Sequence, residues 1–238
     1  MRRKGAMASI SISVVPLMMF IVAWPAKAQD EKTPYPSMAP LEQYLMDRNA
    51  EIALARSAAP QSISADADVL VLGRHGYETA IKGKNSFVCL VERSWTAPNS
   101  DTGFWNPKGR APICLNAPAA RTYLPRTIKK TELVLAGRSK AQMFEAIAAA
   151  VAKKELPALE AGAMCYMLSK EGYLSDQVGH WHPHLMFFVP QTDAAAWGAD
   201  LSGSPILSFD QSVEHMTTFL VPVRHWSDGT SDIPKDEH

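Results

Sequence analysis

Residues 69–93 read Val-Leu-Val-Leu-Gly-Arg-His-Gly-Tyr-Glu-Thr-Ala-Ile-Lys-Gly-Lys-Asn-Ser-Phe-Val-Cys-Leu-Val-Glu-Arg. Three short runs rich in apolar and β-branched residues fill this stretch, at 69–72, 77–81 and 86–93. Residues 73–76 and 83–85 separate them, and breaks that contain Gly and Asn are typical of turns between strands. The stretch therefore predicts an antiparallel meander, which places a β-sheet at the centre of the fold.

Helical patterns lie on both sides of this stretch. Residues 41–56 follow Pro40, which suits the first turn of a helix, and carry apolar residues along one side. The clearest helix is expected to begin at Ser139, because Ser139 and Gln142 form a capping-box pattern ahead of apolar residues at helical spacing.

Strand-like runs return after that helix, at 164–169, 184–189, 205–209 and 217–223, with a short helix expected from 192 or 193 to 197. The order of elements lacks the regular strand–helix alternation of a parallel α/β sheet. We therefore expect residues 41–238 to form a single α+β domain with a mainly antiparallel sheet and two or three helices.

The first 28 residues have the pattern of a cleavable export signal. Three basic residues at 2–4 precede an apolar run at 10–23, and Ala26-Lys27-Ala28 supplies a small-residue cleavage site. An uncleaved membrane anchor is the alternative, but the run is short of the roughly 20 apolar residues that a membrane span needs. Cleavage after Ala28 predicts a periplasmic or secreted protein without a stable membrane anchor, and the proline-containing residues 29–40 are expected to form an exposed leader.

Loss of the signal changes the charge of the chain. The whole sequence has 24 basic and 24 acidic residues, and residues 1–28 contain four basic residues and no acidic one, so the mature chain has 20 and 24, a formal charge of −4. This balance argues against a nucleic-acid partner, because such binders need a basic surface. A small molecule or another protein is the expected partner.

Three cysteines remain after cleavage: Cys89, Cys114 and Cys165. In an oxidising compartment two of them are expected to pair. Cys165 stands in the apolar stretch 163–168 and is interpreted as buried, so the preferred disulfide is Cys89–Cys114. The other connectivities stay open, because sequence alone does not determine them.

The histidine cluster Gly179-His180-Trp181-His182-Pro183-His184 is the most unusual local feature. If the backbone is extended, the three imidazoles share one face, since side chains of a strand alternate. Neutral imidazoles at this spacing suit Zn²⁺ or another divalent transition metal, with His215 as a further ligand from a distant strand. Glu214, His225 and His75 are alternative ligands. The other interpretations are a packed aromatic cluster without metal and acid–base chemistry by one histidine.

Two further stretches, 85–91 and 183–188, resemble a pattern of exported bacterial proteins for which no activity is known. The resemblance covers residues 86–190 and brings no substrate or cofactor with it. It implies that Cys89, Cys114 and His184 belong to a shared scaffold or site, and that His180 and His182 are local additions.

Two functions are therefore expected from the sequence. The first is a soluble, non-catalytic domain that binds a small ligand or a partner outside the cytoplasm. The alternative is a metal-dependent hydrolase built on His180 and His182, with His184 and His215 completing the metal site. Whether the protein is an enzyme is left open, because the sequence contains no Gly-x-Ser-x-Gly, His-Glu-x-x-His, phosphate-binding glycine loop or Cys-x-x-Cys motif.

Overall fold

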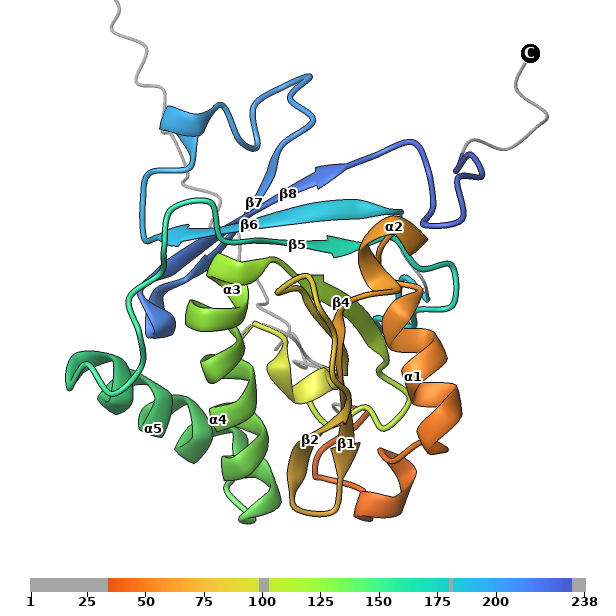
Figure 1. Ribbon diagram of the computed structural model, residues 1–238. Coiled ribbons are helices and arrows are strands. Elements are labelled where there is room, and N and C mark those ends of the chain that lie inside the picture. Colours follow the sequence, from red (N-terminus) through yellow and green to blue (C-terminus); the bar gives the residue numbers. More distant parts are fainter. Residues whose placement is uncertain (1–33, 99–102, 180–181, 233–238) are drawn as a thin grey trace, which may run out of the picture. The chain divides into compact units, whose positions relative to one another are not determined.

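One mixed sheet forms the framework of the computed structural model, which describes residues 34–98, 103–179 and 182–232 (Figure 1). Its eight strands lie in the order β2-β1-β3-β4-β5-β6-β8-β7, and every neighbouring pair is antiparallel except β1 and β3. The predicted α+β class with a mainly antiparallel sheet is confirmed. The strands are β1 (Asp68–Gly73), β2 (Gly76–Ile81), β3 (Val88–Glu92), β4 (Ala111–Leu115), β5 (Met164–Met167), β6 (His184–Pro190), β7 (Leu207–Gln211) and β8 (Met216–Pro222).

The expected meander is correct for its first hairpin and wrong for its third strand. β1 and β2 form a tight hairpin closed by the pair Gly73 and Gly76, but β3 lies on the other side of β1 and runs parallel to it. The backbone N–H of Lys84 donates to the carbonyl of Asp66, which turns the chain back across the start of β1. A Cβ atom at Gly83 would lie 2.2 Å from that carbonyl oxygen, so this crossing requires glycine.

The predicted helices are recovered in part. α5 (Lys140–Ala152) begins at Ser139 with the predicted capping box, in which the Gln142 N–H donates to the Ser139 hydroxyl oxygen and the Ser139 N–H donates to the Gln142 side chain. The helix expected over 41–56 is interrupted, since a 3₁₀ turn (Leu41–Gln43) precedes α1 (Arg48–Arg56), which starts at the N-cap Asp47. Three further helices, α2 (Gln61–Ser64), α3 (Ala117–Thr122) and α4 (Leu124–Leu135), were not predicted from the sequence. Among the described residues no helix is long and apolar enough to cross a membrane.

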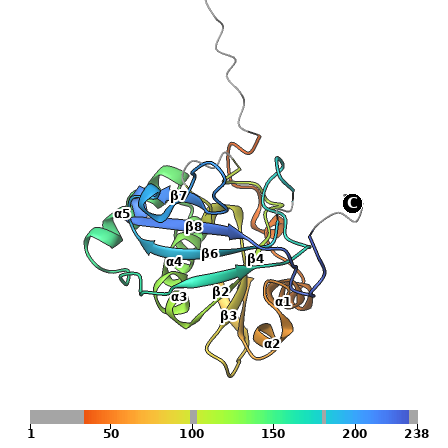
Figure 2. The same cartoon turned by 90° about the horizontal axis from the view of Figure 1, so that it is seen from above.

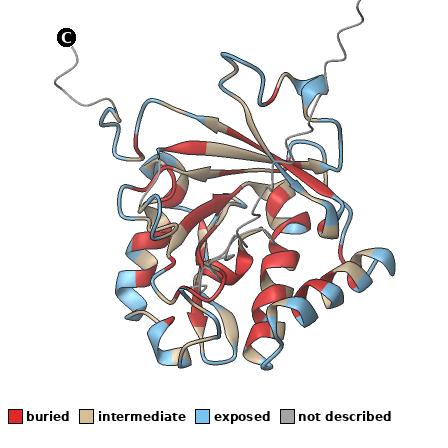
Figure 3. Ribbon diagram, turned by 180° about the vertical axis from the view of Figure 1, so that it is seen from behind, coloured by how far each residue is buried: buried red, intermediate tan, exposed pale blue. Residues whose placement is uncertain are grey.

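The central strands bury both of their faces. Cys89 and Val91 of β3 pack with Leu54 and Ala55 of α1 on one face. Leu90, between them in the strand, packs on the other face with residues of α3 and α4. α1 and α2 therefore cover one side of β3 and α3 to α5 lie on the other, and the buried positions follow the strands and the inner sides of these helices (Figures 2 and 3).

The predicted disulfide Cys89–Cys114 is present. The two cysteines are directly paired neighbours of β3 and β4, and they face α1. Cys165 is buried on the opposite face of the sheet, as its apolar surroundings in the sequence indicated.

A buried ion pair joins α1 to the end of β3. The Arg93 guanidinium donates to the Glu51 carboxylate at 2.8 Å, and the side chains are 0% and 1% exposed. Arg93 also donates to the carbonyls of Tyr44 and Val91, and Glu51 accepts from the N–H of Leu72. Each charge therefore has several hydrogen-bond partners. Such partners help to offset the desolvation penalty of a buried ion pair.

Substitution Glu51→Gln should lower the free energy of unfolding by about 3–5 kcal/mol, because it leaves the Arg93 charge buried without its partner. Glu78→Gln is the matched control, since Glu78 pairs with Arg48 at 2.6 Å but both side chains are at least 50% exposed. Its effect should stay within about 1 kcal/mol. Urea unfolding of both variants measures the difference, and equal effects would show that the buried pair has no special role.

Removal of the disulfide in a Cys89→Ala, Cys114→Ala double variant should cost about 3 kcal/mol, from the chain entropy regained by the loop it closes. The sequence separation of the two cysteines is 25. Thermal unfolding with and without a thiol reductant tests this assignment. The reductant should lower the Tm of the wild type and leave that of the double variant unchanged, and a fall in both would point to an effect other than loss of the bridge.

Candidate functional site

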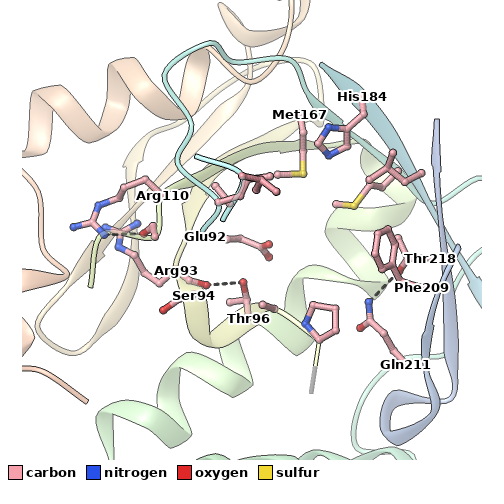
Figure 4. Close-up of a pocket in the computed structure, with 18 of the residues that line it drawn as sticks. Glu92, Arg93, Ser94, Thr96, Arg110, Met167, His184, Phe209, Gln211 and Thr218 are labelled. Atoms are coloured by element: carbon pink, nitrogen blue, oxygen red, sulfur yellow. Dashed lines mark hydrogen bonds between the residues drawn. The ribbon is translucent and has the colours of Figure 1, made fainter. Parts of the chain in front are cut away.

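A cavity of about 370 Å³ opens on the face of the sheet that carries Glu92 (Figure 4). Its floor and sides come from β3 to β8, and Tyr123 and residues of the segments 94–98, 109–110 and 173–178 complete the wall. Most of the lining side chains are apolar or aromatic, among them Met167, Met186, Phe188 and Leu220. A cavity of this size and composition is typical of small-molecule sites.

The strand register explains why residues far apart in the sequence meet here. Directly paired residues of neighbouring antiparallel strands point to the same face of a sheet. Met167 is paired with His184, and Phe188 is paired with Thr218, which is paired in turn with Phe209. The period-two alternation then brings Met186 and Leu220 to the same face, and both line the cavity.

Glu92 supplies the carboxyl group of the cavity. It is the last residue of β3, it is buried, and its side chain points into the cavity (Figure 4). The Thr127 hydroxyl donates to Oε1 at 2.6 Å, and the Tyr123 hydroxyl lies 3.4 Å from the same oxygen. Burial raises the pKa of Glu92, against the smaller opposing effects of the Thr127 hydrogen bond and the Lys130 charge.

A second buried ion pair lies close to Glu92, on the helix side. Lys130 of α4 pairs with Glu214 at 2.5 Å, and both side chains are buried. The Lys130 ammonium also donates to the carbonyl of Thr96, a residue of the cavity wall. Glu214 Oε2 and Arg126 Nε are buried without a hydrogen-bond partner among the described residues. Lys130 therefore acts on Glu92 as a nearby charge whose own partner is Glu214.

The two arginines of the cavity wall direct their guanidinium groups away from it (Figure 4). That of Arg93 is bound to Glu51 and to backbone carbonyls on the α1 side. That of Arg110 donates to the carbonyls of Pro107, Gly109 and Gln43. Neither cation faces the Glu92 carboxyl across the cavity.

His184 is the residue of the predicted histidine cluster that lines the cavity. Its ring is buried, and Nδ1 lies 2.7 Å from the carbonyl oxygen of His182. Because a carbonyl only accepts, Nδ1 carries the proton, which makes Nε2 the acceptor nitrogen of the neutral ring. Burial lowers the pKa of His184, so the neutral form is favoured.

His182 and His215, two other predicted metal ligands, lie in different surroundings from the cavity. His182 is exposed and its Nδ1 lies 2.6 Å from the Asp232 carboxylate. His215 precedes Met216, which is paired with Pro190, whereas His184 is paired with Pro222. The two histidines therefore lie at opposite ends of the β6–β8 ladder, about 20 Å apart at roughly 3.3 Å per residue.

His180 lies outside the described residues, so its predicted role as a metal ligand stays a prediction. Within 34–98, 103–179 and 182–232, no group of three or more His, Cys, Asp or Glu side chains is close enough to hold a metal ion. Cys89, Cys114 and His184, which the resemblance implied to belong together, lie on different faces of the sheet. The disulfide faces α1, and His184 faces the cavity.

A polar cluster around Asp176 lies in the 173–178 segment, next to the cavity-lining residues. Tyr173 and Leu174 line the cavity, and Asp176 in the same segment pairs with Lys108 at 2.7 Å. The hydroxyls of Tyr35 and Tyr173 also donate to the Asp176 carboxylate. Tyr35 belongs to the segment expected to form an exposed leader, and its hydrogen bond ties that segment to residues 173–178, several of which line the cavity.

Sequence reasoning did not single out Glu92. A usable indication was present, because Glu92 and Arg93 are consecutive charges at the end of the apolar run 87–91. Consecutive residues of a strand point to opposite faces. The Glu92 and Arg93 side chains must therefore lie on opposite faces of a buried strand, and each charge needs its own hydrogen-bond or ionic partners there.

Glu92→Gln should change how stability depends on pH. Since the pKa of Glu92 is raised on folding, the stability linked to its protonated form is fully present below the unfolded pKa, near 4.5, and is lost as pH rises through the folded pKa. Urea unfolding between pH 4.5 and 8.5 should therefore show the variant gaining stability relative to the wild type as pH rises. The nearby charge that acts on Glu92 is Lys130, paired with Glu214, while the Arg93 guanidinium points to the other face of the sheet, and all three groups remain in the variant.

Glu160→Gln is the control of opposite sign, because Arg121 lowers the pKa of the exposed Glu160 carboxyl. Any stability that Glu160 contributes is present above its unfolded pKa and is lost as pH falls through the folded pKa.

A parallel pH profile for the wild type and Glu92→Gln would show that Glu92 is not protonated on folding.

Comparisons with protein-family models, with curated proteins and with solved structures gave no match for this chain. The site is therefore interpreted from its own geometry.

Proposed function

We propose that this protein binds a small, mostly apolar molecule in the Glu92 cavity and works in the periplasm or outside the cell. The observation that carries the proposal is the combination of an apolar cavity of about 370 Å³ with one buried carboxyl group directed into it. Apolar walls supply affinity in such sites, and a few polar groups fix the orientation of the ligand. The function proposed is binding without chemical conversion of the ligand.

The extracytoplasmic location is supported by the Cys89–Cys114 bridge, because structural disulfides persist mainly in oxidising compartments. The export signal predicted at residues 1–28 leads to the same extracytoplasmic location. The formal charge of −4 expected for the mature chain favours a small molecule or a protein over nucleic acid as the partner.

The metal-dependent hydrolase stays a prediction. Its ligands His180 and His182 would need partners other than His215, because His215 lies at the far end of the ladder from His184. The His182–Asp232 pair is the arrangement in which a carboxylate orients an imidazole, but it lies on the surface and not in the cavity.

Binding of the neutral fluorophore N-phenyl-1-naphthylamine tests the proposed function. Its emission rises in apolar surroundings, so titration with the wild type should give saturable enhancement. Met186→Trp places a large side chain in the cavity and should weaken binding by about tenfold or more, equivalent to about 1.4 kcal/mol.

Leu201→Trp adds the same side chain at a position that is 54% exposed and outside the cavity, and it should bind the fluorophore like the wild type. Equal binding by the two tryptophan variants would locate the fluorophore elsewhere on the protein. Absence of saturable binding to the wild type would contradict the proposal.

A further inference from the structure

We propose that the ligand of the cavity is an organic cation, an alkyl or aryl ammonium compound whose charged head lies against the Glu92 carboxylate. This inference rests on the proposed function and names the chemical class that the same cavity selects.

The first argument is the charge that the cavity presents. Glu92 places a carboxyl group in the cavity, whereas the guanidinium groups of Arg93 and Arg110 bind partners outside it (Figure 4). Lys130 is paired with Glu214 at 2.5 Å and does not line the cavity. A ligand ammonium would therefore be the cation that directly faces Glu92, whereas a ligand carboxylate would meet a like charge at the same point.

The second argument is the hydrogen bonding of Glu92. The Thr127 and Tyr123 hydroxyls both reach Oε1, and Thr96 is a further hydrogen-bond partner of Glu92. These donors stabilise the ionised carboxylate, and a ligand ammonium would add to their effect against the burial that favours the protonated form. A charge-assisted bond between an ammonium and a carboxylate is about twice as strong as a neutral hydrogen bond.

The third argument is the aromatic wall beside Glu92. Tyr123 stacks on Phe188 with ring centroids 3.8 Å apart, and both line the cavity, as does Phe209. Aromatic faces attract cations, and recognition of ammonium groups commonly combines such faces with a carboxylate. The methionines Met167 and Met186 provide adaptable apolar contacts for the alkyl or aryl part of the ligand.

Isothermal titration calorimetry with hexylammonium, hexan-1-ol and hexanoate tests the inference, because the three probes share a chain and differ in charge. The wild type should bind hexylammonium about tenfold or more tighter than hexan-1-ol, with hexanoate the weakest. Glu92→Gln should remove that preference by weakening hexylammonium binding while changing hexan-1-ol binding less than about threefold. Glu92→Asp, which retains the charge on a shorter side chain, should retain part of the preference.

Asp210→Asn is the matched control, since Asp210 is an exposed acid on β7 next to the lining residues Phe209 and Gln211. It removes the same charge outside the cavity and should leave all three affinities unchanged. Equal loss of hexylammonium binding in Asp210→Asn and Glu92→Gln would assign the preference to the general surface charge and overturn the inference.

The remaining outcomes separate this inference from the proposed function. If hexan-1-ol and N-phenyl-1-naphthylamine bind but hexylammonium does not bind more tightly than the alcohol, the cavity binds neutral molecules and only the inference fails. If neither the probes nor the fluorophore bind the wild type, both the inference and the proposed function fail.

Discussion

The ion pair between Arg93 and Glu51 is the interaction on which the site depends. Arg93 follows the last residue of β3, and its guanidinium is held on the α1 side by Glu51 and by the carbonyls of Tyr44 and Val91. Because consecutive strand residues point in opposite directions, fixing Arg93 on one face fixes Glu92 on the other. Arg93 thus stabilises the fold through its ion pair, and the neighbouring Glu92 faces the cavity.

Glu92 and Arg93 differ in how the surrounding structure treats their charges. The Arg93 charge is matched by a carboxylate and by carbonyls, whereas Glu92 receives hydroxyl bonds and the more distant influence of Lys130. A carboxyl group in such surroundings costs stability, and buried groups of this kind commonly mark functional positions. The binding of a cation would supply the partner that the fold itself leaves out.

The sequence predicted the elements whose patterns are local. The capping box at Ser139 and the 69–81 hairpin follow from short-range chemistry, whereas the Cys89–Cys114 pair, with a sequence separation of 25, was preferred because Cys165 was interpreted as buried. α4 was missed because its buried side includes Thr127, Lys130 and Thr131, so no apolar stripe marks it. The cavity could not be predicted, because it is assembled from six strands through their register. Of the predicted histidine ligands that the structure describes, His184 lines the cavity, and the length of β8 separates it from His215.

The Cys89–Cys114 bridge turns the chain between β3 and β4 into a covalent ring. Part of the cavity wall, at 94–98 and 109–110, lies within that ring, whereas the rest of the wall comes from the sheet and the 173–178 segment. The two ends of the ring stay together whatever residues lie between them, and loop closure depends only weakly on loop length. Ser94, Thr96 and Gly109 are buried in this part of the wall, so changes that would reshape ligand selectivity without shifting the strands that hold Glu92 are expected at the less buried Ala97 and Pro98.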